Sequence, residues 1–315
     1  MHPRLHIPDG FLAPQVALAL WLVTAIVVGV ALRRLAAAPG APRPVLMGLA
    51  GAFVFAAQMF NFPVAAGTSG HLLGGVLVGY LLGPWAGTLV MVTVVGIQAL
   101  LFQDGGLLAL GATAFNMGII GTLGGAAIAR AIGEALGGGR RAALAAVGAA
   151  AWLSVMAAAG LTTLQLGLSG TTDISIGLPA MLGTHALIGI GEALITVAAV
   201  GFIAASAPDI YAAGAAPTRV SLRRRIAAGV GVTAAIVALA SLFASASPDG
   251  LEKIAADLGF LDSAQRPLFD IFADYTIPGL EGPLSTIVAG LVGVAAVLLL
   301  LAALGRIARG RSGSR

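Results

Sequence analysis

Nine long apolar stretches constrain this chain more than any other feature. They lie near residues 12–32, 45–61, 64–82, 85–102, 107–132, 142–166, 179–206, 226–245 and 285–305. An apolar run of about 20 residues is long enough to cross a bilayer as a helix. Only 10% of the residues are charged, whereas a soluble domain has about 25%. The sequence therefore predicts an all-α polytopic membrane protein.

The arginines predict how these helices are oriented. Most of the 17 basic residues fall into four clusters, which are Arg33, Arg34 and Arg43; Arg140 and Arg141; Arg219, Arg223, Arg224 and Arg225; and Arg306, Arg309, Arg311 and Arg315. An even number of spans separates successive clusters, so all four can lie in the cytoplasm. We expect the amino terminus outside and the carboxyl terminus inside. Because the basic residues follow the topology, nucleic-acid binding is not predicted.

The chain divides into three parts. Residues 1–206 form a core of seven predicted helices, residues 207–225 form a basic cytoplasmic linker, and residues 226–315 hold two more membrane helices. A polar excursion between these last two, at about 246–284, carries seven acidic residues against two basic ones. It is expected to be a small extracytoplasmic domain, which could gather cations or control the opening of an amino-terminal loop.

Glycines and the absence of two motifs narrow the function. Small residues let membrane helices approach closely, and this role is expected for most of Gly74, Gly75, Gly79, Gly121, Gly124 and Gly125. The only lysine, Lys253, follows Asp-Gly-Leu-Glu, so the chain lacks a phosphate-binding Walker A loop. It also lacks a His-Glu-x-x-His motif. We therefore expect no enzyme activity, no cofactor, and any ATP hydrolysis on another polypeptide.

Four histidines and no cysteine leave few ligands for a borderline metal ion. They are His2, His6, His71 and His185, all predicted near the external side. His71 ends the segment 61–71, where Pro63, Gly67 and Gly70 interrupt an apolar stretch. Broken backbone at membrane depth is tolerated where it is buried in protein or lines a cavity. The sequence therefore predicts a cavity at His71, against the alternative that this histidine only caps a helix.

Several motifs follow one another in a fixed order along the chain. They are His6-Ile-Pro-Asp-Gly-Phe-Leu12, Phe62-Pro-Val64 with Gly67-Thr-Ser-Gly-His-Leu-Leu-Gly74, Gln103-Asp-Gly-Gly106 with Leu110-Gly-Ala112 and Phe115-Asn-Met117, and His185-Ala-Leu-Ile-Gly-Ile-Gly-Glu192. In these motifs the chain resembles the CbiM/NikM family, the substrate-specific membrane components of energy-coupling-factor (ECF) cobalt and nickel transporters. Pro248-Asp-Gly-Leu-Glu252 resembles the PDGLE (CbiN/NikN-like) accessory module, fused here to the core.

The resemblance implies a substrate site for Co²⁺ or Ni²⁺. In the family the metal is held by the terminal amine, by the amide and imidazole of a histidine at position two, and by the histidine of Gly-Thr-Ser-Gly-His. The imidazoles here are His6 and His71. Four nitrogens in a plane suit Ni²⁺ and accept Co²⁺. The resemblance further implies a bacterial plasma-membrane location, a transmembrane coupling (T) protein and cytoplasmic ATPases as partners.

The start of the chain departs from the family pattern. The family motif begins Met-His-Ile-Pro, but here Leu5-His6 follows Met1-His2-Pro-Arg. One hypothesis, which we favour, is that translation begins at Leu5, from a codon decoded as methionine at initiation. The other is that Met1 and His2 rebuild the chelate on a longer arm.

Further polar residues have two interpretations each. Thr68 and Ser69 could bond His71 or cap the following helix, with the first favoured. Asn116 could orient a ligand or join two helices, and Asp9 could fix the amino-terminal loop through backbone amides or form a local turn.

Glu192 is expected to pair with His185, seven residues earlier on the same helix. Glu192 is nearly the only ionisable group within a span, which disfavours a proton- or sodium-driven secondary carrier, the main alternative.

Overall fold

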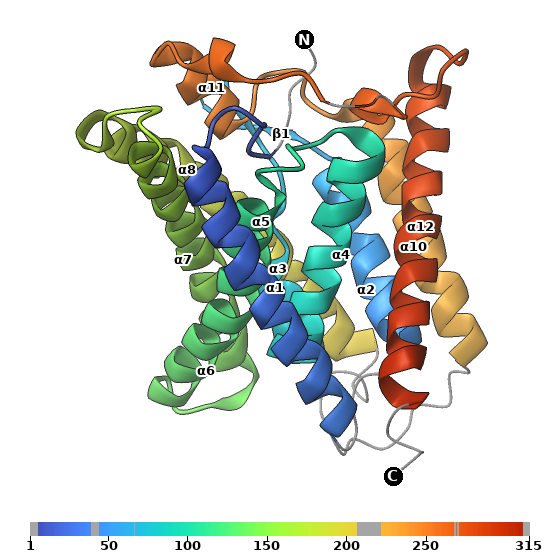
Figure 1. Ribbon diagram of the computed structural model, residues 1–315. Coiled ribbons are helices and arrows are strands. Elements are labelled where there is room, and N and C mark those ends of the chain that lie inside the picture. Colours follow the sequence, from blue (N-terminus) through green and yellow to red (C-terminus); the bar gives the residue numbers. More distant parts are fainter. Residues whose placement is uncertain are drawn as a thin grey trace.

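The protein is a bundle of helices with a single small hairpin among its described residues (Figure 1). The computed structural model describes residues 6–38, 44–65, 67–206, 222–267, 269 and 271–310. Seven of its helices are long and apolar enough to cross a membrane. The all-α polytopic fold class is therefore confirmed.

The core consists of the helices up to residue 206. They are α1 (Pro14–Ala37), α2 (Pro44–Gln58), α3 (Gly75–Leu82), α4 (Pro84–Phe102), α5 (Leu110–Thr113), the π-helix η1 (Ala114–Gly124), α6 (Gly125–Ala135), α7 (Gly139–Leu168) and α8 (Ile174–Ser206). Three of them begin at a proline, which suits the first helical position because the missing N–H has no partner there anyway. α5, η1 and α6 run on as one membrane-length segment, as expected for 107–132.

The predicted span at 64–82 is wrong. Strands β1 (Phe62–Pro63) and β2 (Ser69–Gly70) form an antiparallel hairpin there, and only the eight residues of α3 are helical. Gly74 separates hairpin from helix with a φ of +81°, a left-handed conformation that a residue with a side chain rarely adopts. Residues 64–82 thus enter the bundle without crossing it as one helix. α2, at 15 residues, is also shorter than a typical membrane span.

Glycines allow α3 to pack directly on η1. A β-carbon at Gly75 would lie 2.6 Å from the Met117 carbonyl oxygen and 2.9 Å from the Gly121 Cα. One at Gly79 would lie 2.9 Å from the Thr122 carbonyl oxygen. The packing role expected for these glycines is confirmed, whereas Gly124 faces no neighbouring helix within 4 Å.

The carboxyl-terminal part packs against the core. It contains α10 (Leu222–Phe243), α11 (Gly250–Asp257), the short 3-10 turns η2 (Leu261–Ser263) and η3 (Ala273–Tyr275), and α12 (Gly282–Gly310). α10 and α12 lie on α2, whereas α11 lies on α8 at the same end of the bundle as β1 and the start of α1 (Figure 1). At that end Phe11 meets Phe260 edge-on, with ring centroids 5.2 Å apart.

Candidate metal site

The amino-terminal loop is held inside the bundle by Asp9. Its carboxylate accepts hydrogen bonds from the backbone N–H groups of Leu107, Leu108 and Ala109, at 3.0, 2.8 and 3.0 Å. The Gly106 N–H donates to the Ile7 carbonyl at 2.9 Å. Asp9 therefore bonds backbone amides about 100 residues away, rather than forming a local turn, and so fixes the loop that carries His6.

His6 is buried, with 4% of its surface exposed, and is oriented by Asp104. Its Nδ1 lies 3.1 Å from the Asp104 carbonyl oxygen and 3.3 Å from the carboxylate, which also accepts from the Tyr275 hydroxyl at 2.7 Å. Because a carbonyl only accepts, Nδ1 carries a proton, so the neutral ring has its lone pair on Nε2. Nε2 is buried and has no hydrogen-bond partner among the described residues.

The Asp104 contact changes the pKa of both partners. Burial alone lowers the pKa of His6, but the charge and hydrogen bonds of Asp104 outweigh it, so that this pKa is raised above its ordinary value. Burial raises the pKa of Asp104, but the charge and hydrogen bond of His6 and the Tyr275 hydroxyl outweigh it, and this pKa is lowered. A metal chelate through the amide and ring of His6 itself would need Nδ1, and would therefore displace Asp104.

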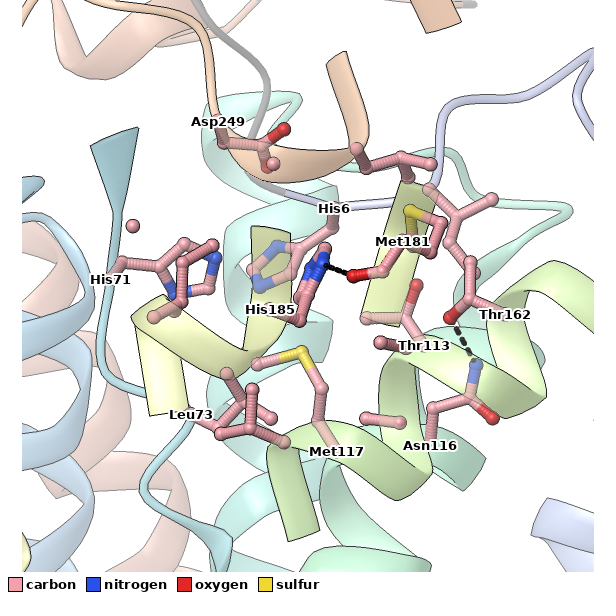
Figure 2. Close-up of a pocket in the computed structure, with 18 residues that line it drawn as sticks. His6, His71, Leu73, Thr113, Asn116, Met117, Thr162, Met181, His185 and Asp249 are labelled. Carbon is pink, nitrogen blue, oxygen red and sulfur yellow. Dashed lines mark hydrogen bonds between the residues drawn. The ribbon is translucent and has the colours of Figure 1, made fainter. Parts of the chain in front are cut away.

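His71 meets His6 across a small cavity (Figure 2). His71 directly follows strand β2 of the hairpin. The His6 and His71 rings lie edge to face, with centroids 5.6 Å apart and planes at 82°. His71 Nδ1 is 3.0 Å from the Leu72 carbonyl, so this ring also carries its lone pair on Nε2. The cavity has a volume of about 80 Å³. Backbone carbonyls that fix the tautomer are a common second layer around metal-binding histidines.

Two further ionisable residues line the cavity, and sequence reasoning did not assign either to the metal site. His185, on α8, bonds the Met181 carbonyl through Nδ1 at 2.8 Å, and Asp249 comes from the carboxyl-terminal part (Figure 2). Burial raises the pKa of Asp249 to about 7. The motifs containing both residues were recognised, but nothing in the sequence indicated that they converge with His6.

The expectation that Ser69 bonds His71 is wrong. The Ser69 hydroxyl donates to the Ser247 carbonyl at 2.8 Å and lies 3.2 Å from the Pro248 carbonyl. Thr68 is buried in the turn of the hairpin, where its backbone N–H donates to Ala65 and its carbonyl accepts from Val64. Neither residue caps α3, whose N-cap is Gly74. Ser69 instead ties the hairpin to the carboxyl-terminal part.

Asn116 joins two helices at the floor of the cavity. Its Nδ2 donates to the Thr162 hydroxyl at 3.0 Å and to Gln165 Oε1 at 2.9 Å, and its Oδ1 accepts from Gln165 Nε2 at 2.7 Å. These bonds connect η1 with α7. They match the interhelical interpretation, and they leave Asn116 in the cavity wall rather than bonded to a histidine.

The expected pair between Glu192 and His185 is not formed. Glu192 is fully buried, and its two carboxylate oxygens accept the backbone N–H groups of Leu73 at 2.6 Å and Gly74 at 2.9 Å. An N–H near the start of a helix has no partner within the helix and carries part of the positive end of its dipole. Glu192 therefore anchors the start of α3, and with it the segment that carries His71, to α8.

Glu192→Ala is expected to destabilise the protein, because it leaves two buried N–H groups without acceptors. Each such group costs about 1–3 kcal/mol. Glu192→Gln keeps one amide oxygen as an acceptor and should lose less. Thermal unfolding in detergent measures both variants, and an alanine variant that melts with the parent would contradict this role.

The remaining predicted ligands, Met1 and His2, lie outside the described residues, as does Leu5. Within the part of the chain that the structure describes, no three histidine, aspartate or glutamate side chains are arranged to hold one ion together. Among the described residues, the predicted metal ligands are therefore the imidazoles of His6 and His71.

Comparison with known proteins identifies the family. The model of the cobalt uptake substrate-specific transmembrane region, CbiM, matches residues 6–210, which is more than half of the chain. The chain belongs to the CbiM family. The PDGLE domain model matches residues 223–310, so this CbiM-family chain also carries that domain at its carboxyl end.

Relatives of this CbiM-family chain include fused nickel transport proteins. A putative fused nickel transport protein, NikMN, from Archaeoglobus fulgidus is 38% identical, over 97% of this chain and 99% of the relative. The fused nickel transport protein NikMN of Rhodobacter capsulatus is 32% identical, over 72% and 70%. A solved structure of a truncated transition metal transporter is 32% identical with a TM-score of 0.57, covering 63% of this chain and 97% of that one.

Proposed function

We propose that this chain is the substrate-binding membrane subunit of an ECF transporter that imports Co²⁺ or Ni²⁺. The observation that carries the proposal is the meeting of His6 and His71, whose ring centroids are 5.6 Å apart in the wall of one cavity. Imidazole suits both ions. The names of the nickel transport relatives and the description of the CbiM family support the same substrate class.

The proposed capture site uses the Nε2 atoms of both rings. Nε2 is the atom left to His6 once its Nδ1 bonds the Asp104 carbonyl. Asp9 holds the amino-terminal loop in the bundle, and the loop thus closes the cavity. An ion without ligands or water is costly in the apolar interior of the bundle. With the loop closed over the cavity, the bound ion therefore cannot leak out.

We assign the histidine end of the bundle to the outside of the plasma membrane. The segments that carry Arg33, Arg34, Arg140 and Arg306 lie at the other end of the bundle, where α1 and α12 end (Figure 1). Basic residues flank membrane helices on the cytoplasmic side. The cavity would then receive its ion from outside. Because the sequence has no Walker A loop, energy comes from separate ATPases through a T protein.

Metal uptake by cells tests this proposal. Cells that express the chain with its T protein and ATPases should accumulate Ni²⁺ or Co²⁺, whereas cells with hydrolysis-deficient ATPases should not. A secondary carrier would behave in the opposite way, because it needs the proton or sodium gradient and no ATPase. Uptake that survives loss of the ATPases but stops with a protonophore or sodium ionophore would overturn the proposal.

A further inference from the structure

Asp249 places a carboxylate of the PDGLE domain in the wall of the histidine cavity (Figure 2). Only 3% of its surface is exposed. One carboxylate oxygen, Oδ1, accepts the Glu252 N–H at 2.7 Å and so caps the start of α11. This bond occupies only one of the two oxygens, and the residue faces the same cavity as His6, His71 and His185.

Specific contacts hold this segment on the cavity. The Ser69 N–H donates to the Pro248 carbonyl at 2.8 Å, and the Ser245 N–H donates to the Asn61 carbonyl at 2.8 Å. At Gly250, a β-carbon would lie 2.8 Å from His185 Cε1 and 3.0 Å from Ile188 Cδ1. Glycine therefore lets the PDGLE segment lie directly on α8. This close approach places Asp249, the preceding residue, at the cavity.

The charge of Asp249 lacks a cationic partner. No lysine or arginine among the described residues forms an ion pair with it. The neighbouring His6 already bonds Asp104. A buried carboxylate without a partner is costly, and a divalent cation in the same cavity would compensate it. The cavity of about 80 Å³ has room for an ion and water.

We propose that Asp249 binds the imported cation through a coordinated water, so that the loaded ion holds the PDGLE domain closed on the core. A bridging water fits the arrangement, because no three histidine or acidic side chains in the described residues converge on one point. This inference rests on the proposed function, since it assigns a further residue to the same metal site.

Asp249→Asn tests the inference through Ni²⁺ affinity, measured by calorimetry on the purified full chain. Asparagine is as good an N-cap as aspartate, so α11 should remain folded while the charge is lost. We expect affinity to fall about 10–100-fold, as for other groups that act around a metal's direct ligands. Asp249→Ser, a second neutral N-cap, should behave in the same way.

Asp257→Asn is the matched control, because it removes the same charge from the other end of α11. Asp257 is exposed and pairs with Lys253, away from the cavity. Its Ni²⁺ affinity should equal that of the parent. Equal affinity in the parent, Asp249→Asn and Asp249→Ser would overturn the inference, as would an equal loss in Asp257→Asn.

Hydrogen exchange of residues 249–258 reports on closure of the PDGLE domain. Ni²⁺ should increase the protection of these amides in the parent, but not in Asp249→Asn at a saturating concentration of the metal. Equal protection in both would overturn the role in closure. The His71→Ala variant separates the two proposals. If His71→Ala loses Ni²⁺ while Asp249→Asn does not, the histidine site stands and the inference fails. If Asp249→Asn loses Ni²⁺ while His71→Ala retains it, the cavity does not bind the ion through His71, and both proposals fail.

Discussion

His71→Ala is expected to retain almost no Ni²⁺ or Co²⁺ after the purified protein is exposed to equal amounts of both ions. The parent should retain about one ion per chain if the two rings bind one metal. His71 supplies one of the two imidazoles that face each other across the cavity. Residues outside a metal's direct ligands cost about 10–100-fold in affinity when lost, and loss of a direct ligand should cost more. Elemental mass spectrometry gives the metal content and the preferred ion.

His185→Ala provides the matched control for this experiment. It removes an imidazole from the same cavity, and this ring, like that of His71, bonds a backbone carbonyl through Nδ1. The CbiM/NikM resemblance assigns no ligand to it, so most of the metal should remain. Retention by His71→Ala equal to that of the parent would remove His71 from the site. Equal losses in the two variants would show that the cavity does not bind through His6 and His71 alone.

Gly75→Ala is expected to destabilise the whole helical core. The added methyl group would lie 2.6 Å from the Met117 carbonyl oxygen and 2.9 Å from the Gly121 Cα, and both are backbone atoms that no change of rotamer can move. α3 and η1 must therefore separate. Overpacking of this kind costs about 1–3 kcal/mol, and occasionally more. The melting temperature in detergent should fall, and metal retention should fall with it because α3 follows His71.

Gly96→Ala in α4 is the control for the change of glycine to alanine within a helix, because alanine favours helix formation in itself. Nothing lies within 4 Å of the β-carbon built at this position. Alanine is favoured over glycine by about 1 kcal/mol inside a helix, so this variant should melt at or above the temperature of the parent. A Gly75→Ala variant as stable as Gly96→Ala would contradict the close approach of α3 and η1.

The sequence alone determined where most of the long helices form, because this depends on the local length and polarity of each segment. Apolar runs bounded by arginines, prolines and glycines predicted α1, α4, α7, α8, α10 and α12 with ends close to those observed. The same local reasoning failed at 64–82. Composition there suits a span, but the left-handed Gly74 and the hairpin before it divide the segment. The order of the motifs was enough to indicate the family and the histidines.

Only the tertiary structure decided which side chains meet. Asp9 bonds residues 107–109, Ser69 bonds residues 247 and 248, and Glu192 bonds residues 73 and 74. Such partners are far apart in the chain, so no local pattern encodes them. The pair expected between Glu192 and His185 failed because two buried backbone N–H groups needed the carboxylate as their acceptor. Asp249 likewise reached the cavity only because Gly250 lets the PDGLE segment lie against α8, a fit that depends on the shapes of two surfaces.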